Sequence, residues 1–158
     1  MSQKSLANWL KVMIVGVGSC AVFVYALVFP QLGQELLPFA TDATLRRLWL
    51  ILVGITAIPC YVSLYFSWNI MTNIGNDVSF TMENARLLHK ISVLGAVDVL
   101  YVFIWNLFLF ILGKNPVVMM TVFLLVAFLG VVITIIFAAL AHLVKKAAVL
   151  QEQSDYTI

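Results

Sequence analysis

The chain alternates between long apolar runs and short polar segments. A helix needs roughly 20 mostly apolar residues to cross a hydrocarbon core about 30 Å thick. Four runs reach that length, and we predict membrane spans at 9–29, 48–70, 91–112 and 117–143. Their apolar residues follow one another without period-two alternation, which is typical of membrane helices rather than of barrel strands.

Polar residues between the runs predict where the helices begin and end. Pro30 closes the first run, and the sequence "GKNP" at 113–116 predicts a tight turn between the last two helices. Thr81 can cap the third helix and Glu83 lies in its first turn, so this helix should begin before its apolar run. Helix propensity stays high through "KKAAVLQEQ", so the last helix should continue about two turns further and end near Ser154.

Composition supports a membrane protein. Hydrophobic residues make up 63% of the 158 residues and charged residues only 10%, whereas about a quarter of a soluble domain is charged. The first apolar run is longer than a signal-peptide core and has no small-residue cleavage site, so we expect an uncleaved helix. The predicted fold is all-α: an integral membrane four-helix bundle that forms a single domain over 1–158, with the lipid bilayer as its first partner.

Basic residues are distributed unevenly between the two ends of this bundle. With four spans both termini lie on one side, and the positive-inside rule places the more basic side in the cytoplasm. The terminal side carries Lys4, Lys11, Arg86, Lys90, Lys145 and Lys146, and the other side carries Arg46, Arg47 and Lys114. We therefore predict a multi-pass protein of the bacterial cytoplasmic membrane, with cytoplasmic termini and a cytoplasmic tail at 144–158.

Two polar side chains, Asp98 and Asn106, share a face of the third span. A carboxylate inside a span costs roughly 2.5 to 3.5 kcal/mol on insertion scales, so Asp98 needs an explanation. It could relay a proton or ion or act as a charge partner for a ligand, or it could be a structural carboxylate bonded to Lys11, Tyr101 or a hydroxyl group on a neighbouring helix. Its depth, similar to that of Lys11, favours the structural interpretation. Asn106 is of the kind that hydrogen-bonds between helices.

Catalytic and metal-binding patterns are lacking in the sequence. There is no phosphate-binding loop, no zinc-protease motif and no paired cysteine motif. His89 and His142 could ligate haem or a metal from antiparallel helices, but both fall at the polar boundary, where interfacial histidines are common. We therefore expect no enzyme activity, no cofactor and no metal.

Two segments outside the spans carry a family resemblance. The connector contains the pattern "F-T-x-E-N-x-x-x-L", and the chain ends in "AAVLQEQSDYTI". Both resemble the bacterial four-helix membrane proteins catalogued as domain of unknown function 2975, whose tails are similar to "A-x-x-L-x-E-E-x-D-L-T-I". The likeness extends over essentially the whole chain, including the turn at Asn115 and Pro116. It departs at Gln153, where the family often has an acid, and at Tyr156, where it often has leucine.

The resemblance carries no biochemical activity, but it implies a partner. Members are often encoded beside a small helix-turn-helix regulator of the Cro/CI type, so it implies a membrane-embedded regulatory protein that binds and restrains such a regulator. The tail would compete with DNA phosphates for the regulator's basic side chains and would not itself contact nucleic acid. The expected partner-binding residues are Phe80, Glu83, Asn84, Leu150, Glu152, Asp155, Tyr156, Thr157 and Ile158.

Asp98 supports an alternative function. A small ion-coupled transporter or resistance protein could use this carboxylate for coupling. Such a protein would be a homo-oligomer, because four helices alone rarely enclose a pathway.

Overall fold

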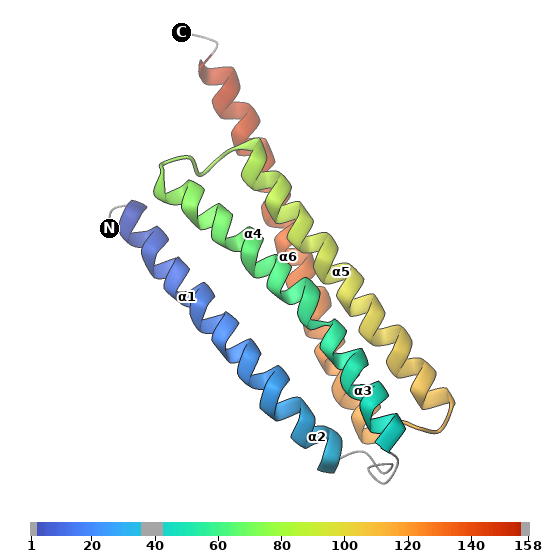
Figure 1. Cartoon of the computed structure of the whole chain (residues 1–158). Helices are drawn as coiled ribbons and strands as arrows, with labels where there is room; N and C mark the ends of the chain where they lie inside the picture. The colour runs from blue at the N-terminus through green and yellow to red at the C-terminus, as the bar shows by residue number, and fades with distance from the viewer. Residues whose placement is uncertain (1–2, 36–42, 156–158) are drawn as a thin grey trace.

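The computed structural model describes residues 3–35 and 43–155, and every element in these ranges is helical (Figure 1). The elements are α1 (Gln3–Phe23), the π-helix η1 (Val24–Val28), α2 (Phe29–Glu35), α3 (Ala43–Ile55), α4 (Ala57–Gly75), α5 (Met82–Ile111) and α6 (Val117–Asp155). The predicted all-α class is confirmed.

Four stretches of the described residues are long and apolar enough to cross a membrane. They are Gln3–Gln31, Thr44–Gly75, Met82–Ile111 and Val117–Ser154. They lie side by side as an up-and-down bundle, with the start of α1 and the end of α6 at the same end (Figure 1). Each stretch covers all or nearly all of one predicted span. It also extends beyond that span, because the helix continues into its polar flank.

The first helical rod passes through Pro30 and ends only at Glu35, contrary to the prediction that Pro30 closes it. Proline lacks an N–H and its ring collides with the carbonyl four residues back, which normally kinks or ends a helix. Here that carbonyl lies in the π-helical turn of η1, where the Phe29 N–H donates to the Val24 oxygen five residues back. This wider turn accommodates the proline, so the chain stays helical.

The second rod is broken at Thr56, between α3 and α4. Its N–H donates to the Val53 oxygen at 3.1 Å, three residues back, and Pro59 follows three residues later without an N–H to donate. The carbonyl oxygen of Leu52 is thus left outside the regular ladder, and the Tyr101 hydroxyl of α5 donates to it at 3.0 Å. A side chain therefore replaces a backbone donor where no water is at hand.

Two apolar clusters hold the bundle, one toward each end. The cluster near the α5–α6 turn is formed by Trp49, Val53, Trp105 and Met119. The cluster near the termini is formed by Ile70, Leu88, Ile91 and Ala141. The most extensive helix contact is between α5 and α6, and α4 packs against both α1 and α5.

Glycines permit the close approach of α5 and α6 between these clusters. A Cβ atom added to Gly95 would lie 2.7 Å from the Thr134 Oγ1, and one added to Gly130 would lie 2.5 Å from a Val99 methyl group. Helices in membranes gain much of their association energy from such backbone approach, because lipid provides no hydrophobic driving force between them.

We expect Gly130→Ala to destabilise the protein. The added methyl group overlaps Val99, and overpacking typically costs about 1 to 3 kcal/mol. The free energy of unfolding in mixed detergent micelles measures this loss. Gly16→Ala is the matched control, because nothing lies within 4 Å of its added Cβ, and combining Gly130→Ala with Val99→Ala should restore stability. Equal stability of the two single variants would contradict the packing described above.

Candidate functional site

A fully buried asparagine lies near each end of α5. Asn84 and Asn106 are each 1% exposed and are the largest fully buried side chains of the described residues. A buried amide loses free energy unless its oxygen and its NH₂ group find partners. In both residues at least one partner comes from the segment that leads into or out of the helix.

Asn84 ties the end of α4 to the connector that precedes α5. Its Oδ1 accepts a hydrogen bond from the Asn73 Nδ2 at 2.7 Å. Its own Nδ2 donates to the carbonyl oxygens of Val78 at 3.0 Å and Ser79 at 2.9 Å, and its backbone N–H donates to the Thr81 Oγ1 at 3.3 Å. The predicted Thr81 cap is confirmed. The Asn84 side chain is buried, so its predicted contact with a partner would need the connector to move.

The connector held by Asn84 exposes apolar side chains at a polar end of the molecule. Asp77 takes a left-handed conformation (φ 61°) in the turn after α4. Beyond it, Val78 is 47% exposed and Phe80 is 56% exposed. Glu83, in the first turn of α5, is exposed as well. Phe80 and Glu83 are therefore both on the surface of the molecule.

The last helix continues well beyond the bundle. α6 has 39 residues, so at 1.5 Å per residue it is about 58 Å long, nearly twice the thickness of a hydrocarbon core. Its C-terminal part projects past the ends of α4 and α5 (Figure 1), and the helix reaches at least to Asp155, the last described residue. Leu150 and Glu152 are exposed on this projection. Of the remaining predicted binding residues, Tyr156, Thr157, Ile158 and the Asp155 side chain lie outside the described part.

Asn106 closes the turn between α5 and α6. Its Nδ2 donates to the Val102 oxygen at 2.9 Å, and its Oδ1 accepts from the Nδ2 of Asn115, itself 6% exposed, at 3.1 Å. The turn also contains Gly113 at φ +66°, as expected for the tight "GKNP" turn. The Asn106 side chain thus bonds to Val102 and Asn115 and not to Asp98.

Asp98 lies partly buried in the middle of α5, and its expected partners bond elsewhere. The Lys11 ammonium lies 5.1 Å from the centre of the Trp68 ring, and the Tyr101 hydroxyl donates to Leu52. Among the described residues, the Asp98 carboxylate accepts no hydrogen bond and forms no ion pair, which contradicts the partners named for its structural interpretation.

The two histidines come together on the outer side of α5 and α6. His89 and His142 line one groove between these helices, together with basic side chains. Within residues 3–35 and 43–155, no group of three or more His, Cys, Asp or Glu side chains could hold a metal ion. The groove therefore brings the two imidazole side chains together with basic side chains that attract anions.

We expect Asn84→Leu to loosen the connector at 76–81. The substitution leaves two carbonyl oxygens and the Asn73 amide without partners, and each buried unsatisfied group costs about 1 to 3 kcal/mol. Hydrogen–deuterium exchange should be markedly faster over these residues, with little change at 117–143. The neighbouring exposed variant Glu83→Gln is the control. Unchanged exchange in Asn84→Leu would show that the amide does not hold the connector.

Comparison with known proteins places this arrangement in a family. No curated protein and no solved structure matches the chain. A family model described as "Protein of unknown function (DUF2975)" matches residues 3–158. That match includes the connector, the corner at Asn115 and the projecting end of α6, so nearly every residue discussed above lies within it. The chain belongs to the DUF2975 family.

Proposed function

We propose that the protein is a regulatory component of the bacterial cytoplasmic membrane that binds and restrains a small cytoplasmic helix-turn-helix regulator of the Cro/CI type. The observation that carries the proposal is the projection of α6. A helix that only had to cross the membrane would need about 20 residues, whereas α6 has 39. The additional turns hold polar and apolar side chains away from the bundle, where a soluble partner can reach them.

The chemistry of the projection fits a basic protein surface with an apolar groove. Leu150 is 66% exposed and Val149 is 38% exposed, and the acidic Glu152 follows within one turn. Exposed apolar residues on a helix are typical anchors for a partner's groove. The acidic group would add attraction to Arg and Lys side chains that otherwise bind DNA phosphates. A regulator held in this way would be kept from its operator.

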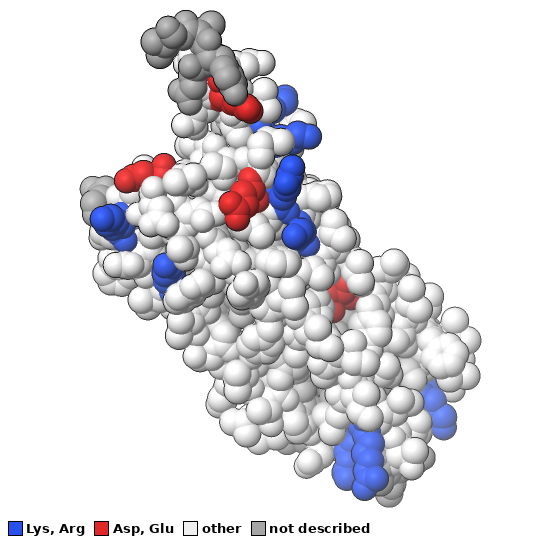
Figure 2. All heavy atoms as spheres, turned by 45° about the horizontal axis from the view of Figure 1, so that its top comes forward, with Lys and Arg blue, Asp and Glu red and all other residues white. Residues whose placement is uncertain are grey.

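Charge supports a cytoplasmic position for this end. Figure 2 shows Lys and Arg side chains at both ends of the face, in several places around the end from which α6 projects and in a smaller group at the opposite end, whereas the broad middle carries few charged side chains. Positive residues accumulate on the cytoplasmic side of membrane proteins. The same orientation would expose Phe80 and Glu83 of the connector to the cytoplasm.

Removal of the residues after Leu150 should abolish capture of the regulator. The full chain and the chain ending at Leu150 would be purified by affinity from native membranes, with identification and quantification of a co-purifying helix-turn-helix protein. We expect this protein with the full chain and at least about a tenfold loss with the truncation, which keeps Leu150 but removes Glu152 and the predicted binding residues after it, contacts that together would be worth about 1.4 kcal/mol or more. Arg47→Ala, at the opposite end of the bundle, is the control and should retain capture. Equal capture by the truncated chain would refute the docking role of this segment.

A second candidate function, ion-coupled transport, rests on Asp98. The observation in its favour is a carboxylate within a span that has no hydrogen-bond or ion-pair partner among the described residues. Such intramembrane carboxylates often mark ion pathways.

Asp98→Asn separates this candidate from a purely structural role. Because no bond to the carboxylate is lost, the variant should unfold at the same temperature as the unsubstituted protein or higher. If the residue couples transport, proton flux into proteoliposomes, followed with a pH-sensitive dye, should fall to the level of empty vesicles. Equal flux in both proteins would exclude coupling through Asp98.

A further inference from the structure

One outward-facing groove follows the α5 and α6 pair over most of its length. On α5, alternating steps of four and three residues from Met82 to Phe103 reach only exposed side chains. On α6, the same steps from Leu124 to Lys145 also reach only exposed side chains. Two adjoining hollows occupy this face, one of about 600 Å³ and the other of about 640 Å³. They are separated by a single helical turn, from Ala138 to Ile135 on α6.

The hollow nearer the termini is basic. Small side chains, including Ala85 and Ala138, leave room in it, and no carboxylate lines it. The side chains that provide positive charge or N–H donors are Arg86, His89, Lys90, His142 and Lys145. Among the described residues none of them forms an ion pair, and the Lys90 ammonium lies 5.5 Å from the centre of the Phe66 ring. This hollow therefore presents uncompensated donors to an anion.

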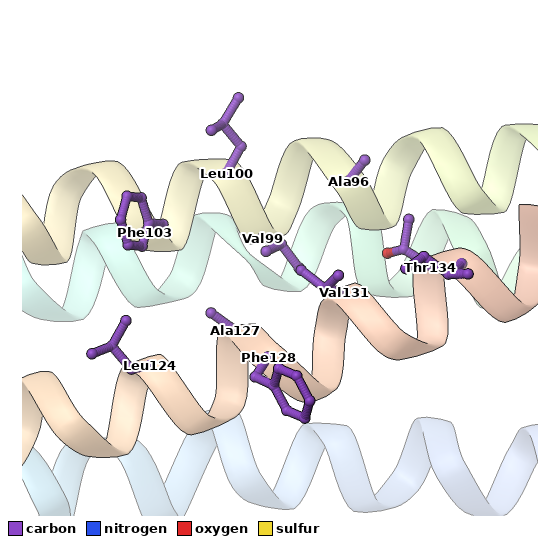
Figure 3. Close-up of a pocket in the computed structure, with 10 residues that line it drawn as sticks. Ala96, Val99, Leu100, Phe103, Leu124, Ala127, Phe128, Val131 and Thr134 are labelled. Carbon is purple, nitrogen blue, oxygen red and sulfur yellow. The ribbon is translucent and has the colours of Figure 1, made fainter.

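The second hollow, deeper in the span, is apolar. Figure 3 shows Val99 and Val131 between α5 and α6, with Phe103 and Leu124 farther along. Thr134 is the only lining residue with a polar side chain, and its hydroxyl oxygen is buried. An alkyl chain fits such a surface and an anion does not.

The spacing of the two hollows matches one leaflet of a bilayer. Lys90 and Phe103 are thirteen residues apart on α5, or about 20 Å at 1.5 Å per residue. One leaflet of hydrocarbon is about 15 Å thick, half of a core of about 30 Å. When the basic hollow lies at the level of the headgroups, the apolar hollow therefore reaches the middle of the membrane.

We propose that this groove is a binding site for an anionic phospholipid. The basic hollow holds the phosphate, with the Arg86 guanidinium able to donate two parallel hydrogen bonds and Lys145 and the histidines adding single donors. An acyl chain lies in the apolar hollow. Basic pockets between membrane helices are suited to anionic headgroups. This proposal does not depend on the regulator or on which side of the membrane the termini lie.

A second copy of the chain is a weaker occupant for the same groove. In a two-fold dimer the same surface is used by both subunits. Two basic hollows would then face one another, and their like charges would repel at a level of the membrane where screening by water is reduced. The charge of the groove thus favours a lipid phosphate.

Native mass spectrometry of the detergent-purified full chain tests the site. Phosphatidylglycerol or phosphatidylcholine with identical acyl chains would be added in a concentration series. We expect tighter binding of phosphatidylglycerol, and a roughly 10- to 30-fold loss of its affinity in the Arg86→Gln, Lys145→Gln double variant, at about 1 kcal/mol for each basic residue. Lys4→Gln with Lys146→Gln is the matched control, because it removes the same charge at the same end from residues that do not line this hollow.

Two further measurements distinguish the source of the phosphate and the depth of the site. Ala96→Trp, which fills the apolar hollow, should weaken phosphatidylglycerol binding while leaving the basic hollow intact. Water-soluble glycerol phosphate should not displace the lipid at equal concentration. Equal binding of the two lipids, equal losses in the two double variants, or displacement by glycerol phosphate would each overturn the proposal. The proposal would also be overturned if the protein formed a dimer that binds no lipid and that Ala96→Trp converts to monomers.

Discussion

The need to pair every polar group that has left water shapes this bundle more than its apolar contacts do. Membrane helices gain little from burying apolar surface against one another, because lipid is equally apolar, whereas an unpaired amide or carbonyl is costly there. The chain meets this need at three irregular points of its described part, although Trp105 Nε1 and Thr134 Oγ1 are buried without a partner. Asn84 serves the connector, Asn106 serves the α5–α6 corner, and the Tyr101 hydroxyl serves the carbonyl released by the break in the second rod. All three side chains belong to α5, which makes this helix the frame to which the other segments are fixed.

This role of α5 determines what the two ends of the molecule can do. At one end the Asn106 corner holds α6 antiparallel against α5, and Gly95 and Gly130 allow the two backbones to approach closely. A helix held so firmly along its span can project beyond it without other support. At the other end Asn84 holds the connector so that Phe80 stays outside the core. The candidate binding surfaces thus depend on buried amides.

Local sequence patterns are enough to predict the helices. The roles of individual residues depend on hydrogen bonds and contacts between helices, which local patterns do not show. The four spans, the Thr81 cap, the glycine turn and the continuation of α6 beyond its span all follow from runs and motifs within a few residues. Asn84 is expected at a binding surface because it belongs to the family-like pattern "F-T-x-E-N-x-x-x-L", whereas the structure shows it buried and bonded to Asn73 and two carbonyl groups. Likewise, depth suggested Lys11 as a partner of Asp98, but the direction of the lysine side chain places it over Trp68. Pro30 predicted a helix end because no local sequence pattern indicates the π-helical turn that precedes it.

The two proposed binding surfaces meet on one rigid helix. Lys145 of the basic hollow and Leu150 of the projection are five residues apart on α6, or about 7.5 Å along its axis. A partner seated on Leu150 would therefore lie close to the headgroup of a lipid held in the groove. Its basic side chains would be attracted by the lipid phosphate as well as by Glu152. By linkage, a lipid that strengthens docking must itself be bound more tightly when the partner is present, by the same factor. The short distance between the groove and the projection thus gives a physical route by which membrane composition could set how much regulator is held.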